Sequence, residues 1–395
     1  MRNIAFLFAF IINLSFANAQ WQNTNMDTIN VHCLFTNGSN IFVGAEGGVY
    51  ISTDYGSTWT FSNNGFPSNI GIYAIATNGT NIFAGTQFNS GVGGVYLSSN
   101  GGSSWSLVNT GLTNTNINSL IVNGTNIFAG TDAGVFISNN NGNSWTSANT
   151  GLPNSAFYSF AINGTDVLVG TQNGIFLSTN NGNNWTSIST GLTDSSVYSL
   201  MVNGANIYAG TGDGVFISSN NGGLWTSIST GITDSAITSL AISGTHLFAG
   251  TANDGVFLSD NNGSSWTSIN TGLPFTTIHS LAISGTDIYT VLSSSTFFKI
   301  WKRPLSEVTE IWQFVNNGYF LIYPNPSTGI LKLESDKLKI QNAEVYNLFG
   351  ERVFQDLNLH LQTENEINLS SLPKGTYFIR VQNERKSYDK KIIIE

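Results

Sequence analysis

Short apolar runs alternate with polar turns from residue 21 to residue 303, and none of these runs has the period of an amphipathic helix. Within one stretch we predict strands at 197–202, 206–210, 214–218 and 225–230. Asn-Gly between alternating apolar residues is a strong hairpin signal, because both central residues of a type I′ turn need positive φ. The pattern therefore predicts an all-β structure for this region.

The same pattern recurs seven times, at intervals of 40 to 45 residues. Its Asn-Gly or Ser-Gly pairs begin at Asn37, Asn78, Asn123, Asn163, Asn203, Ser243 and Ser284. A unit of about forty residues holds four short strands, and repeats of this length are typical of propeller blades. We therefore predict a seven-bladed β-propeller over residues 20–304.

The seventh unit lacks its fourth strand, because the repeat pattern ends at Pro304. Near the other end of the chain, the segment Trp21-Gln22-Asn23-Thr24 is similar to the fourth strands of the other units. We expect this segment to complete the last blade, since a closed ring removes the two exposed edges of an open array.

A second signature, which we call the box, has the form S-x-D/N-x-G-x-x-W and occurs in six units. The boxes end at Trp59, Trp105, Trp145, Trp185, Trp225 and Trp266. The third position is Asp54 in the first box and Asn in the others, which suits a capped turn because both side chains bond their own backbone. We expect the six tryptophans to pack in the blade cores.

These boxes resemble the Asp-box, also called the bacterial neuraminidase repeat, of sialidases and many other propellers. In that family the box is a turn between the third and fourth strands, on the face opposite the active site. The resemblance therefore implies a structural role for Asp54 and the box tryptophans. Sialidases hold the substrate carboxylate with an arginine cluster, and this region has no Arg between position 3 and Arg303, so we expect no sialidase activity.

From Tyr323 onward the composition changes and new motifs appear: YPNPSTG, VYNLFGERV, INLSSLPKGTYFIRV and a basic end, KKIIIE. Together they closely resemble the type A C-terminal sorting domain of the type IX secretion system of Bacteroidetes. Alternating strands and Pro-Gly turns predict a small β-sandwich over 321–395, after a linker at 305–320. The resemblance implies that the type IX machinery is a partner and that the protein is secreted or displayed on a Gram-negative cell.

The first 19 residues resemble a signal peptide, with Arg2, an apolar core and a small-residue end. This segment is too short to span a membrane, and no other apolar stretch approaches that length. Cys33 is the single cysteine, so we expect no disulfide within the chain and interpret Cys33 as a buried apolar residue.

Charge is unevenly distributed, because no Lys or Arg occurs from position 3 to position 298, whereas 21–298 contains eleven acidic residues. A nucleic-acid surface needs clustered basic residues, so we exclude a nucleic-acid partner. The Asn-Asn-Gly turns lack the acidic ligands of a calcium loop, and we expect neither a metal nor a cofactor. Glycosylated, uncharged and cationic partners all remain open, and we expect a neutral glycan or a protein.

One aligned position near the start of each innermost strand varies between units and carries candidate binding residues. They are His32, Tyr73, Asn118, Tyr158, Tyr198, Thr238 and His279. In propellers these strand ends gather around the mouth of the central channel, where Tyr faces and hydroxyl groups suit sugars or peptides. The alternative interpretation is that they only fill the narrow end of each blade.

Acidic residues in the loops between second and third strands offer a different function. They are Glu46, Asp132, Asp213 and Asp254. Two carboxylates facing each other across the channel would make a glycoside hydrolase, whereas solvated loop acids are the simpler interpretation. His32 and His279 without a third ligand make a poor metal site. We predict a non-enzymatic binding or adhesion module, with a carbohydrate-active enzyme as the alternative.

Overall fold

The computed structural model describes residues 20–24, 26, 30–87, 93–274, 276–293 and 298–306, followed by 321–323, 327, 329–334, 342–347, 350–356, 364–382 and 387–394. The predicted signal peptide, 1–19, and residues 307–320 of the predicted linker lie outside these ranges. The chain divides into two compact units, Met1–Thr309 and Glu310–Glu395.

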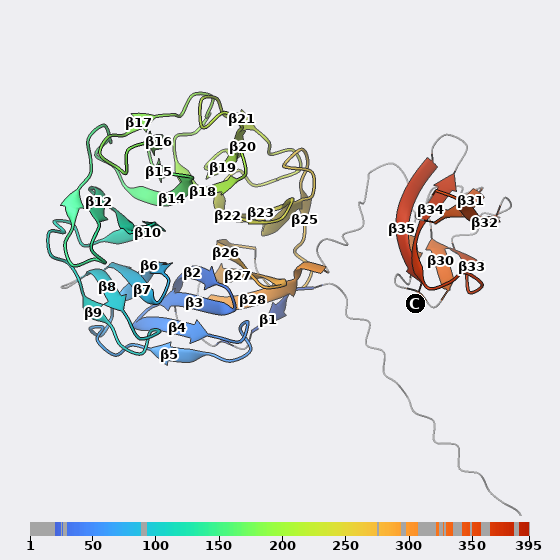
Figure 1. The fold of residues 1–395 in the computed structure, drawn as a ribbon, viewed down its shortest axis with the longest axis horizontal. Helices are drawn as coiled ribbons and strands as arrows, with labels where there is room; N and C mark the ends of the chain where they lie inside the picture. The colour runs from blue at the N-terminus through green and yellow to red at the C-terminus, as the bar shows by residue number, and fades with distance from the viewer. Residues whose placement is uncertain are drawn as a thin grey trace, which may run out of the picture. The chain divides into compact units, whose positions relative to one another are not determined.

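In its described residues the first unit consists of seven four-stranded antiparallel sheets, which we call blades 1 to 7 in chain order. Each first strand contacts the first strands of the two neighbouring blades, and the contact of β2 with β26 closes the circle. Figure 1 shows the first strands nearest the centre of this ring and the fourth strands at its rim. The structure is therefore the predicted seven-bladed β-propeller.

The first strands are β2 (Val31–Asn37), β6 (Gly71–Asn78), β10 (Ile117–Asn123), β14 (Phe157–Asn163), β18 (Val197–Asn203), β22 (Ile237–Ser243) and β26 (Ile278–Ser284). The second strands are β3 (Asn40–Ala45), β7 (Asn81–Gln87), β11 (Asn126–Thr131), β15 (Asp166–Thr171), β19 (Asn206–Thr211), β23 (His246–Thr251) and β27 (Asp287–Ser293). The third strands are β4 (Gly48–Ser52), β8 (Gly94–Ser98), β12 (Gly134–Ser138), β16 (Gly174–Ser178), β20 (Gly214–Ser218), β24 (Val256–Ser259) and β28 (Phe298–Pro304). The fourth strands are β5 (Thr60–Ser62), β9 (Ser106–Leu107), β13 (Thr146–Ser147), β17 (Thr186–Ser187), β21 (Thr226–Ser227), β25 (Thr267–Ser268) and β1 (Gln22–Asn23).

The fourth strands are shorter than the sequence predicts. The apolar pattern indicated a strand at 225–230, but β21 contains only Thr226 and Ser227. After β21 the Ile228 N–H still donates to the carbonyl of Val215 in the same blade, at 2.8 Å. The carbonyl of Thr230 instead accepts a hydrogen bond from the backbone N–H of Trp266 in the next blade, at 2.9 Å. The chain therefore changes from its own sheet to the neighbouring blade over residues 228–230.

The N-terminal strand closes the ring, as predicted. In β1, Gln22 pairs with Lys302 and Asn23 pairs with Trp301, which makes β1 the fourth strand of blade 7. Trp21 is buried, and its indole Nε1–H donates to the carbonyl of Ile269 at 2.8 Å. Trp21 thus takes the place that a box tryptophan occupies in the other blades.

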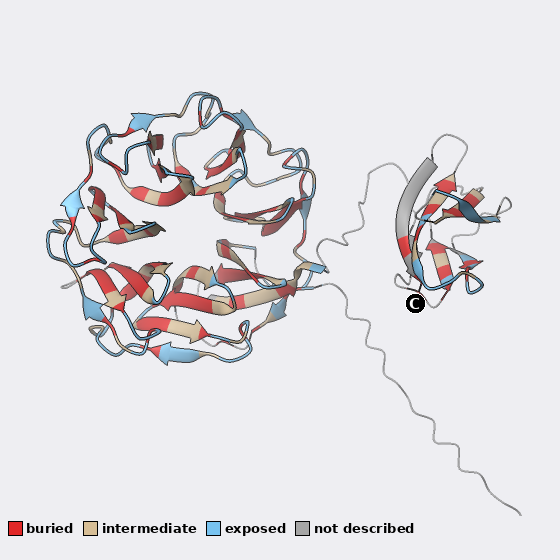
Figure 2. Ribbon diagram, in the orientation of Figure 1, coloured by how far each residue is buried: buried red, intermediate tan, exposed pale blue. Residues whose placement is uncertain are grey.

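Apolar side chains pack between adjacent blades. One cluster combines Phe83 and Val95 of blade 2 with Ile127, Phe136 and Trp145 of blade 3, all buried. Figure 2 shows the inner three strands of the blades largely buried and the fourth strands exposed. Each blade is thus covered by its neighbours on both faces, so that its stability depends on theirs.

The second unit contains two antiparallel sheets. Their orders are β29-β30-β33 and β32-β31-β34-β35. The bounds are β29 (Leu321–Tyr323), β30 (Ile330–Glu334), β31 (Asn342–Tyr346), β32 (Arg352–Asp356), β33 (Glu364–Asn368), β34 (Gly375–Gln382) and β35 (Ser387–Ile394). Leu331 and Ile367 from the first sheet share one buried cluster with Val345, Ile379 and Ile392 from the second. This unit is therefore a small two-sheet sandwich with its own core.

Candidate functional site

The candidate binding residues lie at one end of the ring, which we call the mouth, and a β-bulge places each of them. In blade 1 the register between β2 and β3 shifts between Val31 and Cys33, so His32 is the extra residue. The same shift makes Tyr73, Asn118, Tyr158, Tyr198, Thr238 and His279 extra residues in the other blades. A bulge bends the strand and re-aims the side chain of its extra residue.

The bulge residues differ sharply from their strand neighbours in exposure. The residue before each of them is at most 1% exposed, whereas the bulge residues are half-buried or exposed, with Tyr198 at 40%. The preceding residues, which anchor each strand, are Val31, Ile72, Ile117, Phe157, Val197, Ile237 and Ile278. The fold therefore holds the backbone rigidly at this end while it leaves the variable side chains accessible.

Blades 7, 1 and 2 bring together two histidines, a tyrosine and a carboxylate. The rings of His32 and Tyr73 are stacked, with centroids 4.0 Å apart and planes 14° from parallel. His32 Nε2 lies 3.3 Å from Glu46 Oε2. A Cβ atom on Gly71 would lie 2.7 Å from the Tyr73 ring, so this close arrangement requires glycine at position 71.

Burial governs the electrostatics of this histidine pair. It lowers the pKa of His32, and the hydrogen bond and charge of Glu46 only partly oppose that effect. Burial, followed by the charge of His32, also lowers the pKa of His279. Both imidazoles are therefore neutral at pH 7. Among the described residues, no three His, Cys, Asp or Glu side chains are grouped to hold a metal ion.

Blades 3, 4 and 5 bring a second set together. The rings of Tyr158 and Tyr198 are tilted by 39° with centroids 5.7 Å apart. Asp132 accepts hydrogen bonds from Nδ2 of Asn116 and Nδ2 of Asn118, both at 2.9 Å. The pKa of Tyr158 is raised by burial and then by the charges of Tyr198 and Asp132, so these three groups lie within electrostatic reach of one another.

Thr238 differs from the other bulge residues because its hydroxyl bonds backbone carbonyl groups. Its hydroxyl donates to the carbonyl of Ile278 at 2.7 Å and lies 3.1 Å from that of Gly250. The side chain therefore bridges blades 6 and 7. Asn118 is also engaged, because it accepts a hydrogen bond from Gln87 besides donating to Asp132. The structure thus concentrates accessible aromatic surface in the His32–Tyr73 and Tyr158–Tyr198 pairs.

Each carboxylate proposed for catalysis has a polar partner close by. Glu46 contacts His32, Asp132 contacts two Asn side chains, and the hydroxyls of Thr193 and Thr233 donate to Asp213 and Asp254. Gln87, Asn116, Thr193 and Thr233 were not identified from the sequence. Gln87 ends β7 and the other three lie in polar loops, and only their contacts distinguish them from other polar residues.

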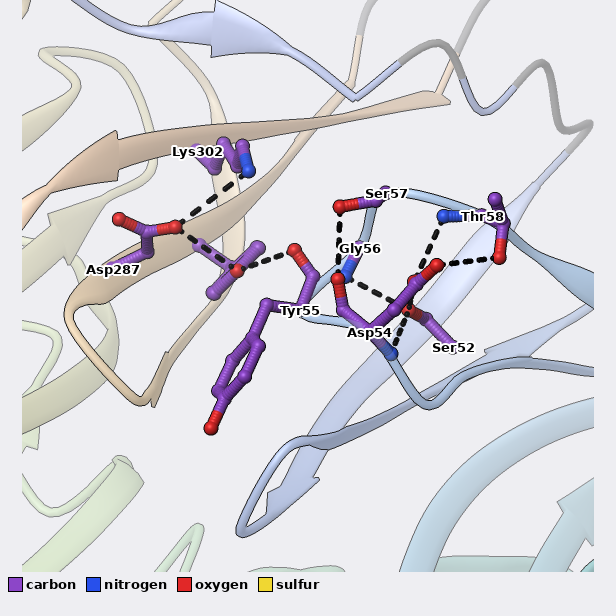
Figure 3. A network of polar contacts seen from close by, with 9 residues as sticks. Ser52, Asp54, Tyr55, Gly56, Ser57, Thr58, Asp287 and Lys302 are labelled. Carbon is purple, nitrogen blue, oxygen red and sulfur yellow. Dashed lines mark hydrogen bonds and ion pairs between the residues drawn. The ribbon is translucent and has the colours of Figure 1, made fainter.

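The box turns lie at the opposite end of the ring and form self-contained polar networks. In the first box the Ser52 hydroxyl donates to Asp54 at 2.8 Å and accepts from the Gly56 N–H at 2.8 Å, while the Thr58 N–H donates to Asp54 (Figure 3). Hydrogen bonds from Thr58 and then Ser52 lower the pKa of Asp54 to about 2. In the other boxes Asn accepts the equivalent bonds.

The fourth box position has a left-handed backbone, and blade 1 differs from the others there. Asn141, Asn181, Asn221 and Asn262 occupy this conformation in their boxes, whereas the first box has Tyr55 with φ of 55°. A bulky residue is strained in this region. The Tyr55 carbonyl accepts a hydrogen bond from the Tyr289 hydroxyl of blade 7 at 2.8 Å, and nearby Asp287 pairs with Lys302 (Figure 3). This network joins the first and last blades.

The box tryptophans lie between blades, and each of the buried ones bonds the preceding blade. The indole Nε1–H of Trp185 donates to the carbonyl of Ala148 at 2.8 Å, and that of Trp225 donates to Ile188 at 2.6 Å. Trp105, Trp145, Trp185, Trp225 and Trp266 are at most 5% exposed, whereas Trp59 is only partly buried. Five of the six tryptophans are thus buried in the cores as expected, and these cores lie at the junctions between neighbouring blades.

Two family models match separate parts of the chain. Residues 154–317 match the DUF6242 beta propeller domain, and residues 321–395 match the secretion system C-terminal sorting domain. The second match implies interaction with the type IX secretion machinery and export to the cell surface or the medium. The protein is thus a secreted or surface β-propeller with a C-terminal sorting domain. No helix in the described part of the chain is long and apolar enough to cross a membrane.

Solved structures with a similar fold come from diverse proteins. The extracellular domain of the putative one component system BT4673 from B. thetaiotaomicron is 19% identical, with a TM-score of 0.59 over 80% of this chain and 45% of that one. The chain thus spans about half of that domain. YCF48 bound to D1 peptide is 11% identical, with a TM-score of 0.57 over 74% of this chain and 96% of that one.

The GH74 xyloglucanase from Xanthomonas campestris is 15% identical, with a TM-score of 0.55 over 81% of this chain and 60% of that one. At such identities the likeness concerns the fold alone. No curated protein sequence matches the chain.

Proposed function

We propose that this protein is a non-enzymatic binding module, displayed or released by the type IX system, whose propeller mouth holds a glycan or protein ligand. The observation that carries the proposal is the set of seven bulges, which present a variable, accessible side chain beside a fully buried neighbour in every blade. Rigid backbone with variable exposed side chains is the arrangement of a recognition surface.

Within this proposal, residues 1–19 are a signal peptide and the six boxes are Asp-box turns with a structural role. The hydrogen bonds within each box support that role, because they satisfy the turn's own backbone and leave the box at the end of the ring away from the mouth. Trp59, Trp105, Trp145, Trp185, Trp225 and Trp266 then serve as joints between blades.

A screen of the purified chain against immobilised glycans and extracellular proteins, repeated with Tyr158→Ala and Tyr198→Ala, tests the binding function. We expect at least one ligand whose affinity falls by about 2 kcal/mol in these variants, as at a hot spot. A matched control is Leu224→Ala, an exposed residue at the box end. Ligands that bind equally well to both tyrosine variants would show that the mouth only packs.

The same preparation tests the absence of catalysis. Two proteins of similar fold have different roles, since YCF48 binds the D1 peptide and the Xanthomonas campestris protein is a xyloglucanase. Xyloglucan is therefore the first substrate to assay. We expect no release of reducing sugar above that of a variant lacking Asp132 and Asp213, whereas release that depends on these carboxylates would favour a glycoside hydrolase.

A further inference from the structure

The fold gathers most of the propeller's carboxylates at the mouth. Loops between second and third strands supply four, and the loops before first strands add Asp194 and Asp234. The Asn253 N–H, in one of the former loops, donates to Asp234 at 2.7 Å. The Gly212 N–H, in another, donates to the carbonyl of Ser196, two residues after Asp194, at 3.2 Å. The six are Glu46, Asp132, Asp194, Asp213, Asp234 and Asp254. Among the residues that the structure describes, Lys299 on the third strand of blade 7 supplies a positive charge at this end.

Two of these carboxylates stand beside an aromatic ring of the next blade. The isolated bridge between Glu46 and Gly71 brings the blade 1 loop against the start of β6, next to Tyr73. Asp132 occupies the same loop of blade 3 and accepts a hydrogen bond from Asn118, whose strand β10 contacts β14, the strand of Tyr158. Burial raises the pKa of Tyr73 and of Tyr158, and the charge of Glu46 adds to the first effect and that of Asp132 to the second. The Tyr158 ring in turn lies 5.7 Å from the exposed ring of Tyr198.

We propose that the mouth binds a basic peptide segment of a partner protein, with a Lys or Arg side chain lying on Tyr158 and Tyr198 and pairing with Asp132. This inference rests on the proposed function, since it names the ligand class of the same mouth. The sequence leaves a cationic partner open but favours a neutral glycan or a protein, because it lacks basic residues in this region.

The chemistry of the site suits a cation better than a sugar. A cation over a tyrosine face is attracted by the ring, and a neighbouring carboxylate adds an ion pair. Each oxygen of Asp132 accepts one amide hydrogen bond, which orients the carboxylate and leaves a lone pair on each oxygen for a guanidinium or ammonium group. An anionic ligand would be repelled by the carboxylates at this end of the ring.

Binding of pentalysine to the full chain, measured by calorimetry at a pH of about 7.5 where the mouth histidines are neutral, tests the proposal. Pentaglutamate and a neutral xyloglucan oligosaccharide serve as comparison probes. The key variants are Asp132→Asn and Tyr158→Ala. The matched control is Asp166→Asn, because it removes the same charge from the hairpin end of β15, opposite the mouth.

We expect pentalysine to bind, pentaglutamate not to bind, and the affinity to fall about fivefold or more in each mouth variant but not in Asp166→Asn. Raising the salt from about 0.05 M to about 0.5 M should weaken binding strongly, because the added ions screen the attraction between exposed charges. No pentalysine binding, or equal loss in Asp132→Asn and Asp166→Asn, would overturn the basic-peptide inference.

The two proposals fail in different ways. If the xyloglucan oligosaccharide or another neutral ligand binds and needs Tyr158 and Tyr198 while pentalysine does not bind, the mouth is a recognition site for a different ligand class. If neither pentalysine nor any ligand from the glycan and protein screen depends on these tyrosines, the proposed function itself is wrong.

Discussion

At the scale of single residues, the chain uses a few side chains as joints between blades. The buried box tryptophans each fill one blade junction and donate a hydrogen bond to the preceding blade. Their partner segment contains a glycine at positive φ, such as Gly151, where an added Cβ would lie 2.1 Å from the Trp185 carbonyl oxygen. Tryptophan and glycine are thus matched across the junction.

Replacing Trp225 with Ala should lower the free energy of unfolding by about 3 to 5 kcal/mol, because a large side chain that is 2% exposed leaves a cavity and an unpaired carbonyl. Chemical denaturation of the purified protein measures the change. Leu224→Ala, at the adjacent position but 52% exposed, is the control and should change stability little. Equal effects from the two substitutions would contradict the junction role.

Asp54 should make the first box sensitive to acid. The hydrogen bonds from Thr58 and Ser52 lower its folded-state pKa from 3.8 to about 2, so the ionised form stabilises the fold above the ordinary pKa. That contribution is lost as the pH falls from about 4 to about 2. In Asp54→Asn, which matches the Asn of the other boxes, the loss should be absent.

Unfolding curves of the wild type and Asp54→Asn at several pH values check this expectation. The difference in stability between the two proteins should shrink or change sign in the acid range and stay constant above a pH of about 5. A difference that does not vary with pH would show that the Asp54 carboxyl has no special environment.

At the scale of elements, two irregularities matter more than the regular strands. The repeated bulge makes one residue per blade accessible, and the type of that residue differs from blade to blade. The short β1 strand makes the ring closed, and it is supported at the same seam by the Thr36 hydroxyl, which donates to the Ile283 carbonyl at 2.8 Å. Both irregularities concern the pairing of strands rather than the strands themselves.

Deleting residues 20–24 should lower the melting temperature sharply and promote association of the protein, because β28 becomes an exposed edge and Trp21 leaves its junction. Differential scanning calorimetry and size-exclusion chromatography measure the two effects. Gln22→Ala, which alters an exposed side chain of β1, is the control. An unchanged melting temperature after the deletion would mean that the ring does not depend on β1.

At the scale of the whole molecule, the proposed binding role and the export signal lie in different units. The propeller has its own cores between blades, and the C-terminal unit has a single separate core. The match of residues 321–395 to a sorting domain places the export signal in the second unit. The two roles should therefore be separable by truncation.

A chain truncated after residue 320 should fold but accumulate in the periplasm, because the export signal is lost while the propeller cores remain intact. Cell fractionation and circular dichroism of the truncated protein provide the measurements. A reporter protein carrying residues 321–395 is the complementary control and should reach the cell surface. Surface delivery of the truncated chain would contradict the sorting assignment.

The sequence by itself determined the all-β class, the number of blades and the closing strand. These features follow from local chemistry that repeats: Asn-Gly pairs specify hairpins through positive φ, and apolar alternation specifies strands. The sorting domain was also identifiable, because its motifs are contiguous and ordered along the chain.

The tertiary structure alone decided where chemistry converges. Trp225 bonds Ile188 of the blade before it, the Tyr158 ring lies 5.7 Å from the Tyr198 ring of the blade after it, and the Tyr289 hydroxyl bonds Tyr55 across the seam. The bulges that present the mouth residues were equally hidden, since a bulge is a mismatch between two paired strands. The repeat pattern specifies the strands and turns within one blade. The mouth and the junctions instead depend on contacts between blades, which join residues roughly one repeat or more apart in the chain.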